Sequence, residues 1–225
     1  RDVYPGDPFW DAFDLEMVQD KGTKDELFAK YEQVIASNPT NYVFPYNYAV
    51  ELYQAGYTQD LEKRPANSRE LIEKSIRNLN KCIELSPDYA SAYMLLGQIQ
   101  YNMGVDINTE MKAIKIPSAD TKLKPEEMKK REELKKKKED LRTQTNAQFD
   151  RALPYLEKVE KLLDTKGKLK MEDKMILKDC LDVMVIIYES KGNKEKAIEI
   201  YRKLSLHNPA KSHYFAAKID QINAN

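Results

Sequence analysis

The chain has few of the residues that form tight turns and few of the cysteines and histidines that form catalytic or metal-binding sites. Its 225 residues include only 7 glycines, 10 prolines, 2 cysteines and 2 histidines. So few glycines and prolines argue against an all-β fold, which needs many tight turns. The helix formers Glu, Lys, Leu, Ala and Met are plentiful instead, so composition favours a helical protein.

The chain also lacks a long hydrophobic run and a net charge. Its longest apolar run is Val183 to Tyr188, whereas a membrane-spanning helix needs about 20 such residues. Lys plus Arg and Asp plus Glu number 37 each, so the formal net charge is zero. We therefore predict no membrane span, and the balance argues against a dedicated nucleic-acid or anionic-membrane binder.

No catalytic or metal-binding pattern is present. The sequence has no G-x-S-x-G elbow, no G-x-G-x-x-G motif and no phosphate-binding loop. His207 and His213 flank the turn at Pro209, six residues apart and without a cysteine, which is not a zinc-ligand spacing. Carboxylate pairs such as Glu126–Glu127 lie among lysines, as on a solvated helix face. We predict no catalytic residue, no metal, no cofactor and no enzyme activity, with both histidines on the surface.

The two cysteines, Cys82 and Cys180, lie among apolar neighbours in strongly helical segments. We interpret them as buried, unpaired thiols that act as small hydrophobes. A disulfide would require their Cα atoms to lie within about 7 Å.

A regular spacing of glycine and proline indicates a repeat. Each of four intervals measures 17 residues: Gly22 to Pro39, Pro39 to Gly56, Pro87 to Gly104, and Gly192 to Pro209. Two such intervals make a 34-residue helix–turn–helix repeat. We expect each proline to end one helix and each glycine to end the other with a left-handed C-cap.

Apolar residues recur at helical spacing inside these intervals. The clearest second helix carries Ala197, Ile198, Ile200, Tyr201 and Leu204, followed by Pro209. The clearest first helix carries Tyr93, Leu96, Gly97 and Tyr101.

These residues resemble the tetratricopeptide repeat, whose first helix carries an aromatic and Leu-Gly, and whose second carries Ala, an aromatic and a closing proline. Other repeats match more loosely, through Tyr48–Ala49, Ser75 with Leu79, and Ala152 with Leu156, where Asp164 replaces the proline. The resemblance implies an all-α, right-handed solenoid of stacked helix pairs.

We predict a single helical-repeat domain over residues 1–225. Its parts are a truncated first unit at 1–39, a repeat at 40–88, a repeat at 89–164 interrupted by a helical arm at 105–148, a repeat at 165–209, and a capping helix at 210–225. The first helix of the interrupted repeat is expected to continue past Gly104.

The arm is rich in charge. Pro125 is placed to start a long helix, and the run from Lys122 to Arg142 holds 10 basic and 6 acidic residues without an aromatic. Interleaved Glu and Lys favour intrahelical ion pairs. We interpret the run as a solvated arm. A protein-contact arm and a nucleic-acid surface are the alternatives, the latter the weakest because no aromatic is available to stack on bases.

This interrupted repeat, with the sequence ALPYLEK from Ala152 to Lys158, is also similar to exported tetratricopeptide proteins of Bacteroidetes-type bacteria. That resemblance implies a periplasmic or envelope location, and a cytoplasmic location is the alternative.

The family resemblance implies that first helices line a concave, ligand-binding face. Carried over by position, the predicted ligand-groove residues are Tyr46, Val50, Tyr53, Gln54, Met94, Gln98, Tyr101, Asn102, Ile186 and Glu189. The primary hypothesis is a protein-interaction scaffold that binds a protein or peptide of unknown identity on this face. One alternative is an assembly element of an envelope complex, which uses the arm and is able to self-associate. The other is nucleic-acid binding through the arm. In the alternative interpretation, Tyr46, Tyr53 and Tyr101 merely pack between repeats or against the inserted segments.

Overall fold

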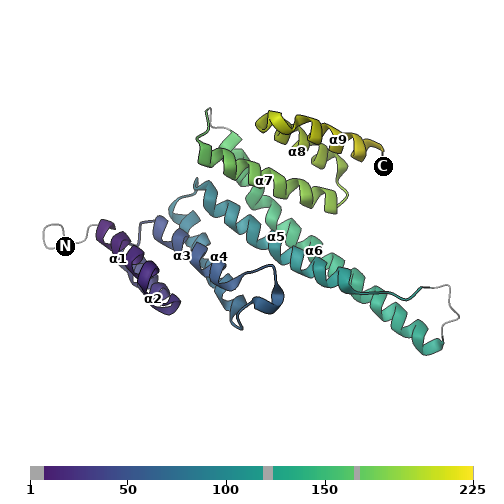
Figure 1. Ribbon diagram of the computed structural model, residues 1–225, viewed down its shortest axis with the longest axis horizontal. Helices are drawn as coiled ribbons and strands as arrows, with labels where there is room; N and C mark the ends of the chain where they lie inside the picture. The colour runs from purple at the N-terminus through teal and green to yellow at the C-terminus, as the bar shows by residue number, and fades with distance from the viewer. Residues whose placement is uncertain (1–7, 119–123, 165–167, 225) are drawn as a thin grey trace. The chain divides into compact units, whose positions relative to one another are not determined.

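The computed structural model describes residues 8–118, 124–164 and 168–224. Within these ranges the chain forms α-helices and two 3₁₀ turns and no strand, which confirms the predicted all-α fold. The helices are α1 (Pro8–Lys21), α2 (Lys24–Ser37), α3 (Val43–Gly56), α4 (Ser68–Leu85), α5 (Ala90–Ala113), α6 (Pro125–Asp164), α7 (Met171–Ser190), α8 (Lys194–His207) and α9 (Ser212–Ala224), as labelled in Figure 1. The start of the predicted first unit, Lys122 of the basic run, and the residues 165–167 and 225 lie outside the described ranges.

The chain divides into two compact units, Arg1–Leu95 and Leu96–Asn225. The boundary falls inside α5, so that helix begins in the first unit and continues in the second.

The first unit stacks α1 on α2, α2 on α3, and α3 on α4. Its core combines leucines and valines with two tyrosine rings, Tyr31 and Tyr48, stacked at 5.1 Å between centroids. Helices α3 and α4 meet at Ala49, whose carbonyl accepts a 2.7 Å hydrogen bond from the buried Ser75 hydroxyl. Small residues at these two positions let the backbones approach.

The second unit packs α5 against α6, α6 against α7, α7 against α8, and α8 against α9 (Figure 1). The contact between α5 and α6 depends on two glycines of α5. Gly97 lies against the Leu156 side chain and Gly104 against the Phe149 ring. The fully buried side chains of this unit include Leu156, Leu163, Leu177, Leu181 and Ile187.

The predicted helix ends at proline are confirmed. Helices α2, α4 and α8 each end two residues before the proline that was expected to stop them, at Pro39, Pro87 and Pro209. At each of these ends the backbone N–H of the C-cap residue donates to a carbonyl four residues back.

The predicted glycine caps are correct at one site only. Gly192 has a φ of 70°, and among the described residues no other glycine has a positive φ. Gly104 does not end a helix, because α5 continues through it to Ala113. A Cβ there would lie 2.6 Å from Cε1 of Phe149, so the glycine serves close helix packing. Gly22 and Gly56 lie at helix ends without the left-handed conformation.

The interruption of the repeat predicted at 89–164 consists of two lengthened helices. Helix α5 continues past Gly104, and α6 begins at Pro125 and runs for 40 residues, as predicted. Two contacts join α6 to α5 and to the segment that follows α5. Lys137 lies 3.0 Å from Glu110, and Arg131 Nε donates to the Pro117 carbonyl at 3.0 Å.

Candidate protein-interaction surfaces

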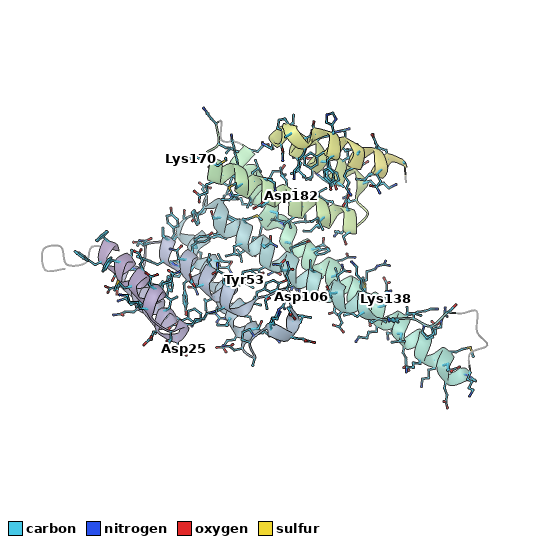
Figure 2. All side chains as sticks on the ribbon, viewed as in Figure 1. Asp25, Tyr53, Asp106, Lys138, Lys170 and Asp182 are labelled. Atoms are coloured by element: carbon cyan, nitrogen blue, oxygen red, sulfur yellow. The ribbon has the colours of Figure 1, made fainter. Side chains whose placement is uncertain are left out.

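Four of the predicted groove residues lie on α3 in the first unit. Tyr46, Val50 and Tyr53 are half-buried and Gln54 is exposed. Tyr46 meets the Tyr89 ring edge-on at 5.0 Å, and Tyr53 stacks on Tyr57 at 5.1 Å. Both tyrosines therefore have a packing role inside the unit, as in the alternative interpretation of these rings. Figure 2 labels Tyr53 on α3.

Four more lie on α5, with Met94 in the first unit and Gln98, Tyr101 and Asn102 in the second. All four are half-buried. The Gln98 side-chain amide donates to Asn102 Oδ1 at 2.9 Å. Tyr101 stacks on Phe149 of α6 with 5.7 Å between centroids, and burial raises the pKa of its hydroxyl. Its ring is thus part of the α5–α6 packing.

The last two predicted residues, Ile186 and Glu189, are exposed on α7. Ile186 leaves 45% of its surface open to solvent, whereas its neighbours Val185 and Ile187 are buried. Glu189 accepts a 2.9 Å hydrogen bond from the Tyr201 hydroxyl of α8. Burial, and then that hydrogen bond, raise the pKa of Tyr201.

A cavity of about 420 Å³ lies between α7, α8 and α9. Its apolar surface comes from the buried Leu204 and Phe215, and Tyr214 adds a ring that is 56% exposed. The remaining lining is polar: Lys178, Asp182, His207, Asn208 and Lys211.

A second cavity of about 360 Å³ lies farther along the same three helices, α7, α8 and α9. It is lined by Glu189, Gly192, Lys194, Ala197, Lys218, Gln221 and Ile222. The first cavity joins the middle of α7 to the start of α9, and the second joins the carboxyl-terminal parts of both helices, so the two helices run in the same direction. We call the surface formed by both cavities and Ile186 the α7–α9 groove. Figure 2 labels Asp182, on the part of α7 that lines the first cavity.

The charges of the α7–α9 groove are mixed. Lys178 and Asp182 form a 2.7 Å ion pair, and this hydrogen bond raises the pKa of Lys178. On α9, Lys218 Nζ lies 5.9 Å from the centre of the Tyr214 ring. The two cavities together hold four lysines and two carboxylates, so the groove carries a small positive excess.

The predicted groove did not include α9, because residues 210–225 were predicted to form a capping helix. The Tyr214–Phe215 pair was the available signal, because an exposed aromatic next to a buried one is a feature of binding surfaces as well as of caps.

The arm carries a further depression of about 240 Å³. It is lined by Met111, Ile116, Lys135, Lys138, Glu139 and Arg142. Two of these cations have carboxylate neighbours on their own helix: Lys135 lies 2.7 Å from Glu132, and Arg142 lies 3.6 Å from Glu139. The predicted intrahelical pairing is therefore present. Lys138 is labelled on α6 in Figure 2.

The described residues contain no group of three or more His, Cys, Asp or Glu side chains placed to hold a metal ion. Both cysteines are free and buried, and burial raises the pKa of the Cys82 thiol to about 11. Both histidines are exposed. In the ranges that the structure describes, no helix is long and apolar enough to cross a membrane.

Comparison with known families gives two matches. A TPR repeat model matches residues 68–104, and a Tetratricopeptide repeat model matches residues 184–206. The chain contains tetratricopeptide repeats. The first match covers α4 and the beginning of α5, and the second covers the end of α7 and most of α8. A comparison with curated proteins found no match.

These matches confirm the predicted family and its helix-pair solenoid fold. Tetratricopeptide repeats generally mediate protein–protein interaction and typically serve as non-enzymatic scaffolds. The bacterial group, the periplasmic location, the division into repeats and the individual groove residues stay predictions.

Proposed function

We propose that this chain is a non-enzymatic scaffold that binds a segment of a partner protein, and that the α7–α9 groove is its principal binding site. The observation that carries the proposal is the pair of cavities that α7, α8 and α9 line, with Ile186 exposed on α7 between the residues that line them. A concave surface with an apolar floor and a few polar groups is typical of a recognition site.

The first cavity suits an apolar side chain of a ligand. Its volume of about 420 Å³ is within the usual range of about 300 to 1,000 Å³ for binding pockets. Leu204 and Phe215 provide an apolar floor, while Asn208 and the charged residues offer hydrogen bonds at the rim. Apolar contact supplies affinity, and the few polar groups fix the orientation of the ligand.

The spacing of the two cavities suits an extended peptide. Asp182 lines one and Glu189 the other, and seven helical residues span about 10 Å. About three extended residues cover that distance. A segment with an apolar residue and a residue of negative charge about three positions away matches the groove and its excess of lysine.

Photocrosslinking in the native host tests this site. We expect a photoreactive amino acid at position 186 to capture a protein partner, because Ile186 is exposed in the groove. Leu206 is the matched control: it is 79% exposed and lines neither cavity. Adducts that form equally at 186 and 206, or at neither, would contradict the proposal.

A photoreactive amino acid at a third position, 136, distinguishes binding in the groove from binding at the arm. Lys136 is exposed on α6, and adducts there without adducts at 186 would favour the assembly-element alternative. The α3 face of the first unit is a separate surface. The pair Tyr46→Ala and Tyr53→Ala tests it, with circular dichroism to verify folding because both rings pack on neighbours.

A further inference from the structure

Helix α1 presents an apolar stripe to solvent. Phe9, Phe13 and Met17 are 62%, 47% and 41% exposed. Residues four apart in an α-helix lie on the same face, so these three side chains form one continuous row. Single exposed apolar residues are common on protein surfaces, but a contiguous row of large ones marks an interaction site.

The opposite face of α1 packs on the core of the first unit and on α2. Leu15 is buried in the core of the first unit and Val18 packs against it. Lys30 of α2 pairs with Asp14 at 3.0 Å, and the Asn38 side chain donates to Asp11 at 2.7 Å. Helix α1 is thus held by α2 through one face, and the stripe lies on the other face.

The charges of α1 favour a protein partner over a lipid surface. The helix carries Asp11, Asp14, Glu16 and Asp20 against the single cation Lys21. Helices that lie on membranes are rich in lysine and arginine on their polar face. An acidic helix would be repelled by anionic lipid.

We propose that the stripe is a self-association surface, on which α1 of a second copy of this chain packs in antiparallel orientation. The row is symmetric about Phe13, with one large apolar residue four positions to each side. A two-fold axis through Phe13 places the two Phe13 rings together and each Phe9 opposite Met17 of the other copy. Such isologous contacts, in which one patch meets itself, are the commonest way that soluble proteins form dimers.

The acidic residues decide the orientation. Glu16 lies three residues from Phe13, so antiparallel pairing separates the two Glu16 residues by about 9 Å along the axis. The two Asp20 residues are then about 21 Å apart, well beyond the screening length of about 8 Å at physiological salt. Parallel pairing would place each acidic residue beside the same residue of the other chain. The formal net charge of zero adds no long-range repulsion between the chains.

Analytical ultracentrifugation over a range of concentrations tests the proposal. We expect the unaltered chain to dimerise, and Phe13→Glu to raise the dimer dissociation constant at least about tenfold. Leu206→Glu is the matched control, because it introduces the same charge at a highly exposed leucine in the second unit. A chain that stays monomeric throughout, or a dimer equally stable in both variants, overturns the proposal.

Cysteine crosslinking tests the orientation independently. Phe13→Cys is expected to form a disulfide-linked dimer under mild oxidation, whereas Phe9→Cys and Met17→Cys crosslink only when mixed. The native cysteines are buried and do not compete. Efficient self-crosslinking of Phe9→Cys, or no crosslinking at position 13, overturns the antiparallel arrangement.

Discussion

Single small residues set the distance between helices in this protein. Gly97 is buried on α5, where an added Cβ would lie 2.7 Å from Cδ2 of Leu156. Leu156 is fully buried on α6, so its side chain has little room to move. The glycine at this position of the repeat is therefore required by packing rather than by backbone conformation.

We expect Gly97→Ala to lower the free energy of unfolding by about 1 to 3 kcal/mol, as overpacking of a close-packed core does. Leu156→Ala removes both atoms that would clash, Cδ2 and Cγ, which lie 2.7 and 2.8 Å from the added Cβ. The double variant should therefore be less destabilised than the sum of the two single variants, as measured by urea denaturation. Gly192→Ala is the control, because a Cβ there meets no atom within 4 Å and should show no coupling to Leu156. Additive effects of Gly97→Ala and Leu156→Ala would disprove the contact.

At the scale of an element, α6 tolerates a helix-breaking residue. Pro154 lies inside the 40-residue helix and is exposed. Proline has no backbone N–H, and its ring crowds the carbonyl four residues earlier, which belongs to Asp150. The helix persists because flanking residues such as Ala152, Leu156 and Val159 are buried against neighbouring helices.

Pro154→Ala is expected to raise the free energy of unfolding, by at most about 3 kcal/mol, since it restores a hydrogen bond and no buried contact is lost. Thermal and urea denaturation measure the change. The control is Pro125→Ala at the first residue of the same helix, where proline is compatible with the helix and no gain is expected. Equal effects at both positions would show that Pro154 imposes no cost.

At the scale of the whole molecule, buried tyrosines link stability to alkaline pH. Burial raises the pKa of Tyr31 and of Tyr89 to about 12, and raises the pKa of Tyr188 and Tyr201 as well. The first two belong to the first unit and the others to the second, so both units share the effect.

An unfolded tyrosine ionises near pH 10, whereas folded Tyr31 and Tyr89 keep their protons until about pH 12. The folded state therefore binds more protons between these values. The stability contributed by this difference is fully present below about pH 10 and is lost as pH rises toward 12. Urea midpoints should fall across this window, and the fall should be smaller in Tyr31→Phe. An unchanged slope in that variant would contradict the assignment.

Much of the fold was predictable because its signals are local. Helix ends at Pro39, Pro87 and Pro209, the left-handed Gly192 and the start of α6 at Pro125 each depend on the backbone chemistry of one or two residues. Apolar periodicity identified the buried faces of α5, α6 and α8 through Leu96, Leu156 and Tyr201. Helix α1 was not predicted, because its buried and exposed faces are both apolar and it lacks the glycine–proline spacing.

The candidate site was predictable only in part. Ile186 and Glu189 were expected on an open face and are exposed, but Tyr101 was placed there too and packs on Phe149. The sequence shows that a residue lies on a given side of its helix. It does not show which side chain from a segment 48 residues later in the sequence will cover it.

The sequence by itself determined an all-helical chain of tetratricopeptide repeats with a charged helical arm, because helix propensity, proline stops and periodicity act over a few residues. Only the tertiary structure decided that Gly104 makes room for Phe149, that α9 joins α7 in lining two cavities, and that α1 leaves Phe9, Phe13 and Met17 uncovered. These features depend on how helices distant in sequence pack, and packing is set by the shapes of both partners together.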